Sequence, residues 1–143
     1  MGDIIVKTKV GEYIIKDDLL YTKTDEWVRI EGDIVTLGIT DYAQKKLRYI
    51  VNVELPEKNS EVKAGSSIVT LESVKTVADV YSPFNGKIVE VNTALLDEPD
   101  LINKDPYGKG WIVKIKVHGT ISKEALLTPQ QYADKIKKEE EEK

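Results

Sequence analysis

The feature that most constrains this chain is the recurrence of short alternating runs of β-branched and aromatic residues, separated by residues that favour turns. From Trp27 to Ile39, apolar residues alternate with polar ones on both sides of Gly32, and glycine tolerates the positive φ that a tight hairpin requires. Many short strands joined in this way favour an antiparallel sandwich or a barrel. The alternation alone does not distinguish between these two architectures.

Two further stretches show where strands are expected. Residues 3–10 and 12–17 are rich in β-branched residues and are divided by a single glycine, so we expect a hairpin near the N-terminus. Val51, Val53 and Leu55 alternate with polar residues, and we expect them on one face of a strand.

Three places carry the start signals of helices. Thr40 or Asp41 precedes a short amphipathic stretch that either residue could cap. Ser122 could cap a second short helix that follows it directly. Thr128 and Gln131 have the spacing of a capping box, with proline between them at the first helical position, so a C-terminal helix is expected there.

The composition narrows the class of protein. With 143 residues, 41% of them hydrophobic, the chain is long enough for one domain with a substantial core. Its net charge of −4, with basic residues scattered among acidic ones, disfavours nucleic-acid binding. No apolar run is long enough to span a membrane, and no signal or transit sequence is recognisable, so we expect a cytoplasmic protein.

Residues that could carry catalysis or hold a metal are few. Cysteine is absent, which excludes disulfides, thiolate metal sites and cysteine nucleophiles. His118 is the only histidine, and no nucleophile with an activating partner stands near it in the sequence. The carboxylates lack metal-ligand spacing, and the glycines form no phosphate-binding loop. We therefore expect a protein that is not itself an enzyme.

One lysine stands out from this background. Lys75 lies between two strand-like stretches, flanked by Val74 and Val77, and neither glycine nor proline marks the expected turn. A lysine in a turn is usually just a solvated residue. At the tip of a hairpin, however, its amine would be open to a modifying enzyme, and the acids Glu72 and Asp79 would keep that tip hydrated and recognisable.

The segment around this lysine resembles a known family. "LESVKTVADVYSP" is similar to the lipoyl-attachment segment of the H protein of the glycine cleavage system. The resemblance extends in order through "YTKTDEWVRIEGDIVTLGITDYAQKKL", "VNVELPE", "SPFNGKIVEVN", "LINKDPYGKGWIVKIK" and "LLTPQQY". It covers the chain from about Leu20 to Tyr132.

The resemblance implies a fold and a domain organisation. The family fold is mainly β, a barrel-sandwich hybrid of two antiparallel sheets with small helices, including one at the C-terminus. Residues 1–143 would form a single lipoyl-carrier domain. Residues 1–19 would add strands at one edge, and residues 128–143 would form the C-terminal helix and a charged tail.

The resemblance also implies a cofactor and a set of partners. Lys75 would carry lipoic acid in amide linkage, attached by a lipoate ligase or transferase. The carrier would receive an aminomethyl group from glycine decarboxylase, the P protein, and deliver it to the aminomethyltransferase, the T protein. Dihydrolipoamide dehydrogenase, the L protein, would then reoxidise the dithiol.

Other residues take expected roles from the same resemblance. Glu26 matches an acidic position in the cleft that receives the arm, and we expect it to contact the ammonium group of the cargo; otherwise it is a solvated acid at a strand edge. The residues expected to guide lipoylation are Glu72, Ser73, Val74 and Asp79.

The chain departs from the family pattern beside this region. Asp25 stands where histidine is usual, Arg48 and Tyr49 replace a glycine followed by an acid, and Lys46 adds a cation. These changes leave the attachment segment intact but alter the expected cleft wall and docking surface.

Several alternatives remain open from the sequence. One is an H-like lipoyl carrier that serves another pathway, such as sulfur oxidation or lipoate distribution. Another is the lipoyl domain of a 2-oxoacid dehydrogenase complex, although the segment "ESVK" counts against it. A biotin carrier is disfavoured because Val74 and Thr76 stand where methionines would flank the lysine. A β-rich interaction module with an unmodified lysine is the plainest alternative.

Overall fold

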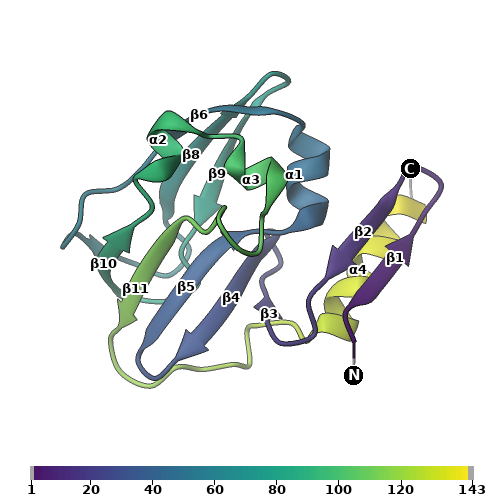
Figure 1. Ribbon diagram of the computed structural model, residues 1–143. Helices are drawn as coiled ribbons and strands as arrows, with labels where there is room; N and C mark the ends of the chain where they lie inside the picture. Colours follow the sequence, from purple (N-terminus) through teal and green to yellow (C-terminus); the bar gives the residue numbers. More distant parts are fainter. Residues whose placement is uncertain (1, 142–143) are drawn as a thin grey trace.

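Two antiparallel sheets form the body of the protein, and a third, smaller sheet lies beside them (Figure 1). The computed structural model describes residues 2–141. The larger sheet has the strand order β3-β4-β5-β11-β10-β7, and the second has the order β6-β8-β9. In that order the strands span Leu20–Tyr21, Glu26–Glu31, Ile34–Ile39, Val113–Val117, Gly86–Val91 and Glu61–Val62, then Ile50–Glu54, Ser67–Ser73 and Val77–Tyr81.

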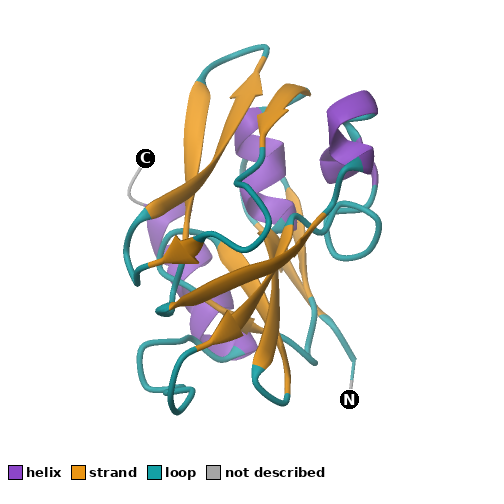
Figure 2. Cartoon of the chain, turned by 90° about the vertical axis from the view of Figure 1, so that its left-hand side faces the viewer, coloured by secondary structure: helices purple, strands orange, loops and turns teal. Residues whose placement is uncertain are grey.

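The apolar faces of these two sheets enclose the main core. Leu37 from β5 and Ile115 from β11 are fully buried in the same cluster as Leu71 from β8 and Val80 from β9. The view in Figure 2 shows the β8–β9 hairpin extending beyond this core at one end of the molecule. The predicted mainly β architecture with small helices is confirmed.

The N-terminal strands form a sheet of their own. β1 (Ile4–Lys7) pairs only with β2 (Glu12–Ile15), so the expectation that this segment extends one edge of the body is wrong. The buried face of the hairpin, which includes Ile15, packs against Ile136 of the C-terminal helix α4 in a second cluster. A two-stranded hairpin is marginal alone, and the helix supplies the apolar surface that it needs.

Two of the predicted helix starts are confirmed. Helix α1 (Asp41–Leu47) is capped by Thr40, whose Oγ1 accepts the N–H of Ala43 at 3.1 Å. Helix α4 (Pro129–Glu141) begins with a reciprocal capping box. There the N–H of Gln131 donates to Thr128 Oγ1 at 3.2 Å, and the N–H of Thr128 donates to Gln131 Oε1 at 2.9 Å.

The helix expected after Ser122 is wrong. Residues 123–126 form a turn, and Leu127 then pairs with Tyr21 in an isolated β-bridge that ties this segment to β3. Two short helices that the sequence did not predict are present instead, α2 (Ala94–Asp97) and α3 (Leu101–Lys104). The stretch after Ser122 is not helical because both backbone groups of Leu127 bond to the backbone of Tyr21.

The expected common face of Val51, Val53 and Leu55 is also wrong. Val51 is 46% exposed, whereas Ile50 and Val53 are buried. The register between β6 and β8 shifts between Ile50 and Asn52, which is the signature of a β-bulge. One extra residue in a strand reverses the alternation, so Val51 faces solvent.

The acidic C-terminal run is helical as far as the structure describes it. Tyr13 donates its hydroxyl to Glu140 at 2.7 Å, and Tyr42 donates to Glu139 at 3.0 Å, so these acids anchor α4 to the hairpin and to α1. The last two residues of the predicted tail, 142–143, lie outside the described residues. Among residues 2–141, no helix has the length and apolar character needed to cross a membrane.

Candidate functional site

Lys75 lies in the turn between β8 and β9, as the sequence predicts. The side chain of Ser73 holds this turn: its Oγ accepts the N–H groups of Lys75 at 3.1 Å and Thr76 at 2.9 Å, and donates to the Thr76 carbonyl at 3.0 Å. None of residues 74–76 has a positive φ. A serine-capped turn without left-handed residues explains why the sequence needs no glycine there.

The turn is braced from the neighbouring strand. The N–H of Val74 donates to the carbonyl of Tyr49 at 3.0 Å, next to the start of β6. The Tyr49 hydroxyl in turn donates to Asp100 at 2.9 Å. The backbone of the tip is therefore fixed at two points, while the side chain of Lys75 is left to move.

The amine of Lys75 is open to solvent. Its side chain makes no hydrogen bond or ion pair with any residue among 2–141. The flanking Val74 and Val77 are 66% and 62% exposed. A free, uncompensated amine on a fixed turn between exposed apolar residues is what an enzyme needs in order to acylate it.

The four residues expected to guide lipoylation occupy different settings. Glu72 and Val74 are exposed beside the tip, where an incoming enzyme can reach them. Ser73 is buried, and its hydroxyl is committed to the turn. Asp79 is exposed and accepts a weak hydrogen bond from Thr70 at 3.3 Å.

Glu26 is buried, so the alternative that it is a solvated acid at a strand edge is wrong. It is 1% exposed, and its Oε1 accepts the hydroxyls of Thr22 and Thr24, each at 2.5 Å. Its Oε2 accepts the N–H of Tyr81, at the far end of β9 from Lys75, at 3.2 Å. Burial raises the pKa of Glu26, and these hydrogen bonds oppose that rise.

Two grooves lie along the β9 side of the protein and share Thr24 as a lining residue. The first, which we call the inner groove, has a volume of about 190 Å³ and is lined by Asp25, Lys46, Ala78 and Asp79 among others. The second, about 480 Å³, is lined by Glu26 and Tyr81, and we call it the carboxylate groove. The inner groove borders β9 of the Lys75 hairpin, and the carboxylate groove reaches the buried Glu26.

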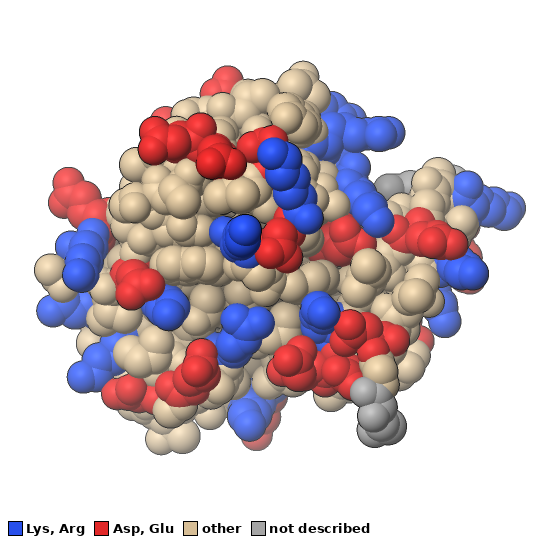
Figure 3. Space-filling view, viewed as in Figure 1, with Lys and Arg blue, Asp and Glu red and all other residues tan. Residues whose placement is uncertain are grey.

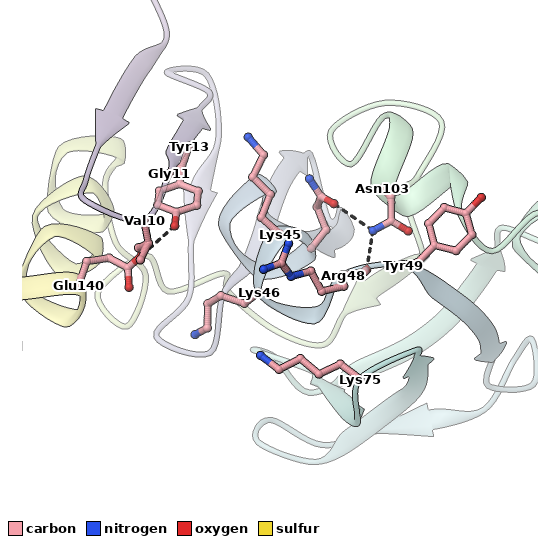
Figure 4. A pocket seen from close by; sticks show the side chains of 11 residues that line it. Val10, Gly11, Tyr13, Lys45, Lys46, Arg48, Tyr49, Lys75, Asn103 and Glu140 are labelled. Carbon is pink, nitrogen blue, oxygen red and sulfur yellow. Dashed lines mark hydrogen bonds between the residues drawn. The ribbon is translucent and has the colours of Figure 1, made fainter. Parts of the chain in front are cut away.

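A third groove lies at the hairpin tip itself. This tip groove has a volume of about 530 Å³ and reaches from Lys75 across α1 to the apex of the β1–β2 hairpin at Val10. Figure 4 shows Lys46 and Arg48 extending from α1 and its C-terminal end towards the gap that Lys75 borders. Both cations were identified from the sequence as departures from the family pattern, but their position beside the N-terminal hairpin was not predicted.

The sequence analysis missed the role of one residue that shapes this site and did not identify another. Ser73 was expected to guide an enzyme, and its structural role in the turn was not foreseen. Asn103 in α3 was not singled out, although its side chain bonds to the carbonyl of Arg48 at 2.7 Å and to the N–H of Ile50 at 2.9 Å. No local signal could have found Asn103, because its partners lie more than fifty residues away.

The N-terminal hairpin precedes the part of the chain that a known family matches. The model of the family described as glycine cleavage H-protein matches residues 19–139. A probable glycine cleavage system H protein of Aeropyrum pernix is 50% identical over 143 residues, which cover 99% of this chain and 100% of that protein. A probable glycine cleavage system H protein of Saccharolobus solfataricus is 56% identical over 131 residues, covering 90% of this chain and 96% of that protein.

A solved structure agrees with these sequence matches. The crystal structure of a glycine cleavage system H protein from Mycobacterium marinum superimposes with a TM-score of 0.78 at 41% identity, covering 85% of this chain and 98% of that chain. The likeness confirms the expected barrel-sandwich hybrid of the lipoyl-domain type. Family model, relatives and fold agree over most of the chain, which therefore belongs to the glycine cleavage H-protein family.

Proposed function

We propose that this chain is the lipoyl-bearing carrier of a glycine cleavage system and that Lys75 is its attachment point. Residues 1–143 act as one carrier domain in the cytoplasm and catalyse no reaction alone. A lipoate ligase or transferase acylates the Lys75 amine. Glycine decarboxylase, the aminomethyltransferase and dihydrolipoamide dehydrogenase then use the modified protein in turn. The exposed, unpaired amine of Lys75 at a fixed turn is the observation that carries this proposal.

The residues present fit a lipoyl group. An amide bond to the group requires an accessible lysine amine, which the tip provides, and it removes the positive charge of that amine. When bound, the group supplies a dithiol that can hold an aminomethyl unit and be reoxidised. The exposed Val74 and Val77 at its base offer apolar contacts to a mostly hydrocarbon chain.

The protein contributes position rather than chemistry. Ser73 and the bond from Val74 to Tyr49 fix the tip, so that the cargo moves only on the flexible side chain. Tethering of this kind raises the local concentration of the cargo near a docked partner to the order of mM. A rigid base and a long flexible limb together allow one small protein to serve several active sites.

Glu26 fits the role of an acid that holds the cargo, although its carboxylate is buried. The aminomethyl unit carries a cationic amine, and a carboxylate held by three hydrogen bonds can pair with it at the floor of the carboxylate groove. Asp79 in the inner groove adds an exposed acid along the approach, whereas Asp25 there is already paired with Lys46 and Lys135. We propose that these two grooves, with Glu26 as the anchor for the amine, shelter the loaded cargo from water between partners.

Replacing Glu26 with glutamine is expected to speed the loss of the cargo about tenfold, since one charge-assisted hydrogen bond is lost. The measurement is ammonia release from protein loaded by glycine decarboxylase and then isolated. The matched control is Glu31→Gln, which removes an exposed acid at the other end of β4 and should leave the rate unchanged. Equal rates for wild type and Glu26→Gln would exclude Glu26 from this role.

The attachment itself is tested by intact mass. After expression or incubation with a lipoate ligase and lipoate, the wild-type protein is expected to gain the mass of a single lipoyl group. A wild-type mass that stays unchanged under conditions in which the ligase modifies another carrier would reject the proposal in favour of an unmodified interaction module.

A further inference from the structure

Arg48 adopts a backbone conformation that is almost restricted to glycine. It follows the last residue of α1 with φ 70° and ψ −152°, a region that other residues avoid because of their Cβ atoms. A glycine at this position would relieve the strain. Strain of this kind is found at functional positions, so it points to a role for the Arg48 side chain.

The surrounding structure imposes this conformation. The N–H of Arg48 caps α1 by donating to the carbonyl of Gln44 at 2.9 Å. The side-chain amide of Asn103 donates to the Arg48 carbonyl at 2.7 Å and to Gln44 Oε1 at 3.0 Å, and its oxygen accepts the N–H of Ile50. These contacts hold the backbone on both sides of Tyr49, and they fix the point from which the Arg48 side chain extends.

The Arg48 side chain lines the tip groove. Among the residues that the structure describes, the groove is lined by the cations Lys45, Lys46, Arg48 and Lys75 and by one carboxylate, that of Glu140. Figure 3 shows basic side chains gathered over α1 on the side that faces the N-terminal hairpin. The Glu140 carboxylate already accepts the hydroxyl of Tyr13.

Three cations lie on α1 and at its C-terminal end, and Arg48 is the one that forms no ion pair with a described residue. Lys45 pairs with Asp41 at 3.1 Å, and Lys46 has a weaker pair with Asp25 at 3.9 Å. Arg48 is exposed and has no ion pair with any described residue. The groove therefore has an excess of positive charge in a chain whose net charge is −4.

Exposed apolar side chains surround these cations. Val10 at the hairpin apex is 72% exposed and Tyr49 is 55% exposed, and both line the groove. Val74 and Val77 continue the apolar surface past Lys75. Apolar side chains interspersed with arginine are typical of protein–protein interfaces, whereas a nucleic-acid site would rely on a larger basic surface.

We propose that the tip groove is a docking surface for an acidic patch on a glycine cleavage enzyme that uses the arm at residue 75, with Arg48 as its main charged contact. The surface is composite, because the β1–β2 hairpin contributes Val10 from outside the matched family region. This inference rests on the proposed carrier function and adds to it the chemistry by which partners recognise this carrier. The strained arginine provides affinity at the expense of folding stability.

The test compares three forms of the chain, wild type, Arg48→Gly and Arg48→Lys, each with and without the lipoyl group. Their affinities for glycine decarboxylase, the aminomethyltransferase and dihydrolipoamide dehydrogenase are measured by calorimetry at low and high salt. Arg48→Gly is expected to lose about tenfold in affinity for at least one of these enzymes at low salt, a loss typical of an interface arginine. The affinity of wild type should fall with salt more steeply than that of the glycine variant.

Thermal unfolding separates a docking role from a purely structural one. If Arg48 were purely structural, Arg48→Gly would unfold at a lower temperature than wild type. Arg48→Gly is expected to unfold about 3 °C higher than wild type because the backbone strain is removed. Weaker binding by a more stable protein cannot be a result of misfolding. Arg48→Lys keeps the charge and should retain most of the affinity, and Lys116→Ser, which removes a cation from β11, should bind as wild type does.

Each contrary outcome has a defined meaning. Unchanged affinity of Arg48→Gly for all three enzymes overturns the docking surface, while lipoylation of the same samples would leave the carrier function intact. Tight binding of single-stranded DNA that Arg48→Gly alone abolishes would assign the groove to nucleic acid instead and also overturn the inference. A wild-type chain that cannot be lipoylated would be a failure of the proposed function and not of the groove.

Discussion

Replacing Lys75 with arginine is expected to abolish lipoylation and to reduce glycine-dependent carbon dioxide exchange with glycine decarboxylase to the background rate. A guanidinium stays protonated at physiological pH and does not accept the acyl group, although it keeps the charge and approximate size of lysine. The fold should be unaffected, because the Lys75 side chain is exposed and contacts no described residue through a hydrogen bond or ion pair. Intact mass and the exchange assay measure the two effects on the same preparation.

A second lysine in a turn provides the matched control for this substitution. Lys63 is exposed in the turn that precedes β8, and Lys63→Arg should gain one lipoyl group and support exchange as wild type does. A lipoyl mass gain in Lys75→Arg would show that another lysine is modified. The assignment of the attachment point would then be wrong even if the protein still worked as a carrier.

Replacing Gly38 with alanine is expected to lower the free energy of unfolding by ~3 kcal/mol. Gly38 in β5 pairs with Trp27 in β4, and a Cβ added there would lie 2.5 Å from the Trp27 indole nitrogen. That indole cannot move aside: it is fully buried, and its N–H donates to the Pro106 carbonyl at 2.8 Å. Urea or thermal unfolding measures the loss, which corresponds to about 10 °C in the midpoint.

The same substitution should also affect the site, because Glu26 directly precedes Trp27. A displaced indole would shift the buried carboxylate relative to its hydroxyl donors. Gly2→Ala is the control, since a Cβ at Gly2 meets nothing within 4 Å and should change stability by less than about 0.5 kcal/mol. A Gly38→Ala protein as stable as wild type would mean that Trp27 is not held in the place described.

Local signals explain what could be predicted from the sequence. The turn at Lys75 follows from two strand-like stretches that meet there, and the capping residues Thr40 and Thr128 act on backbone groups within three positions of themselves. The predicted hairpin of residues 3–17 forms because its own alternation closes it. Features of this kind depend on neighbours in the chain, which a sequence displays directly.

The features that could not be predicted depend on distant partners. The β1–β2 hairpin leaves the body because α4, more than a hundred residues later, covers its apolar face. Glu26 is buried because Thr22, Thr24 and Tyr81 converge on it, whereas its position in a strand indicated only a possible edge acid. Alternation cannot reveal a bulge such as that in β6, because the extra residue looks like any other.

The most direct test of the carrier account is carbon dioxide exchange by a glycine decarboxylase from the same source, titrated with this protein. The account predicts glycine-dependent exchange that rises with the lipoylated protein to saturation and is absent with the unmodified protein. A lipoylated sample that supports no exchange with that decarboxylase would contradict the account and favour a lipoyl carrier of another pathway.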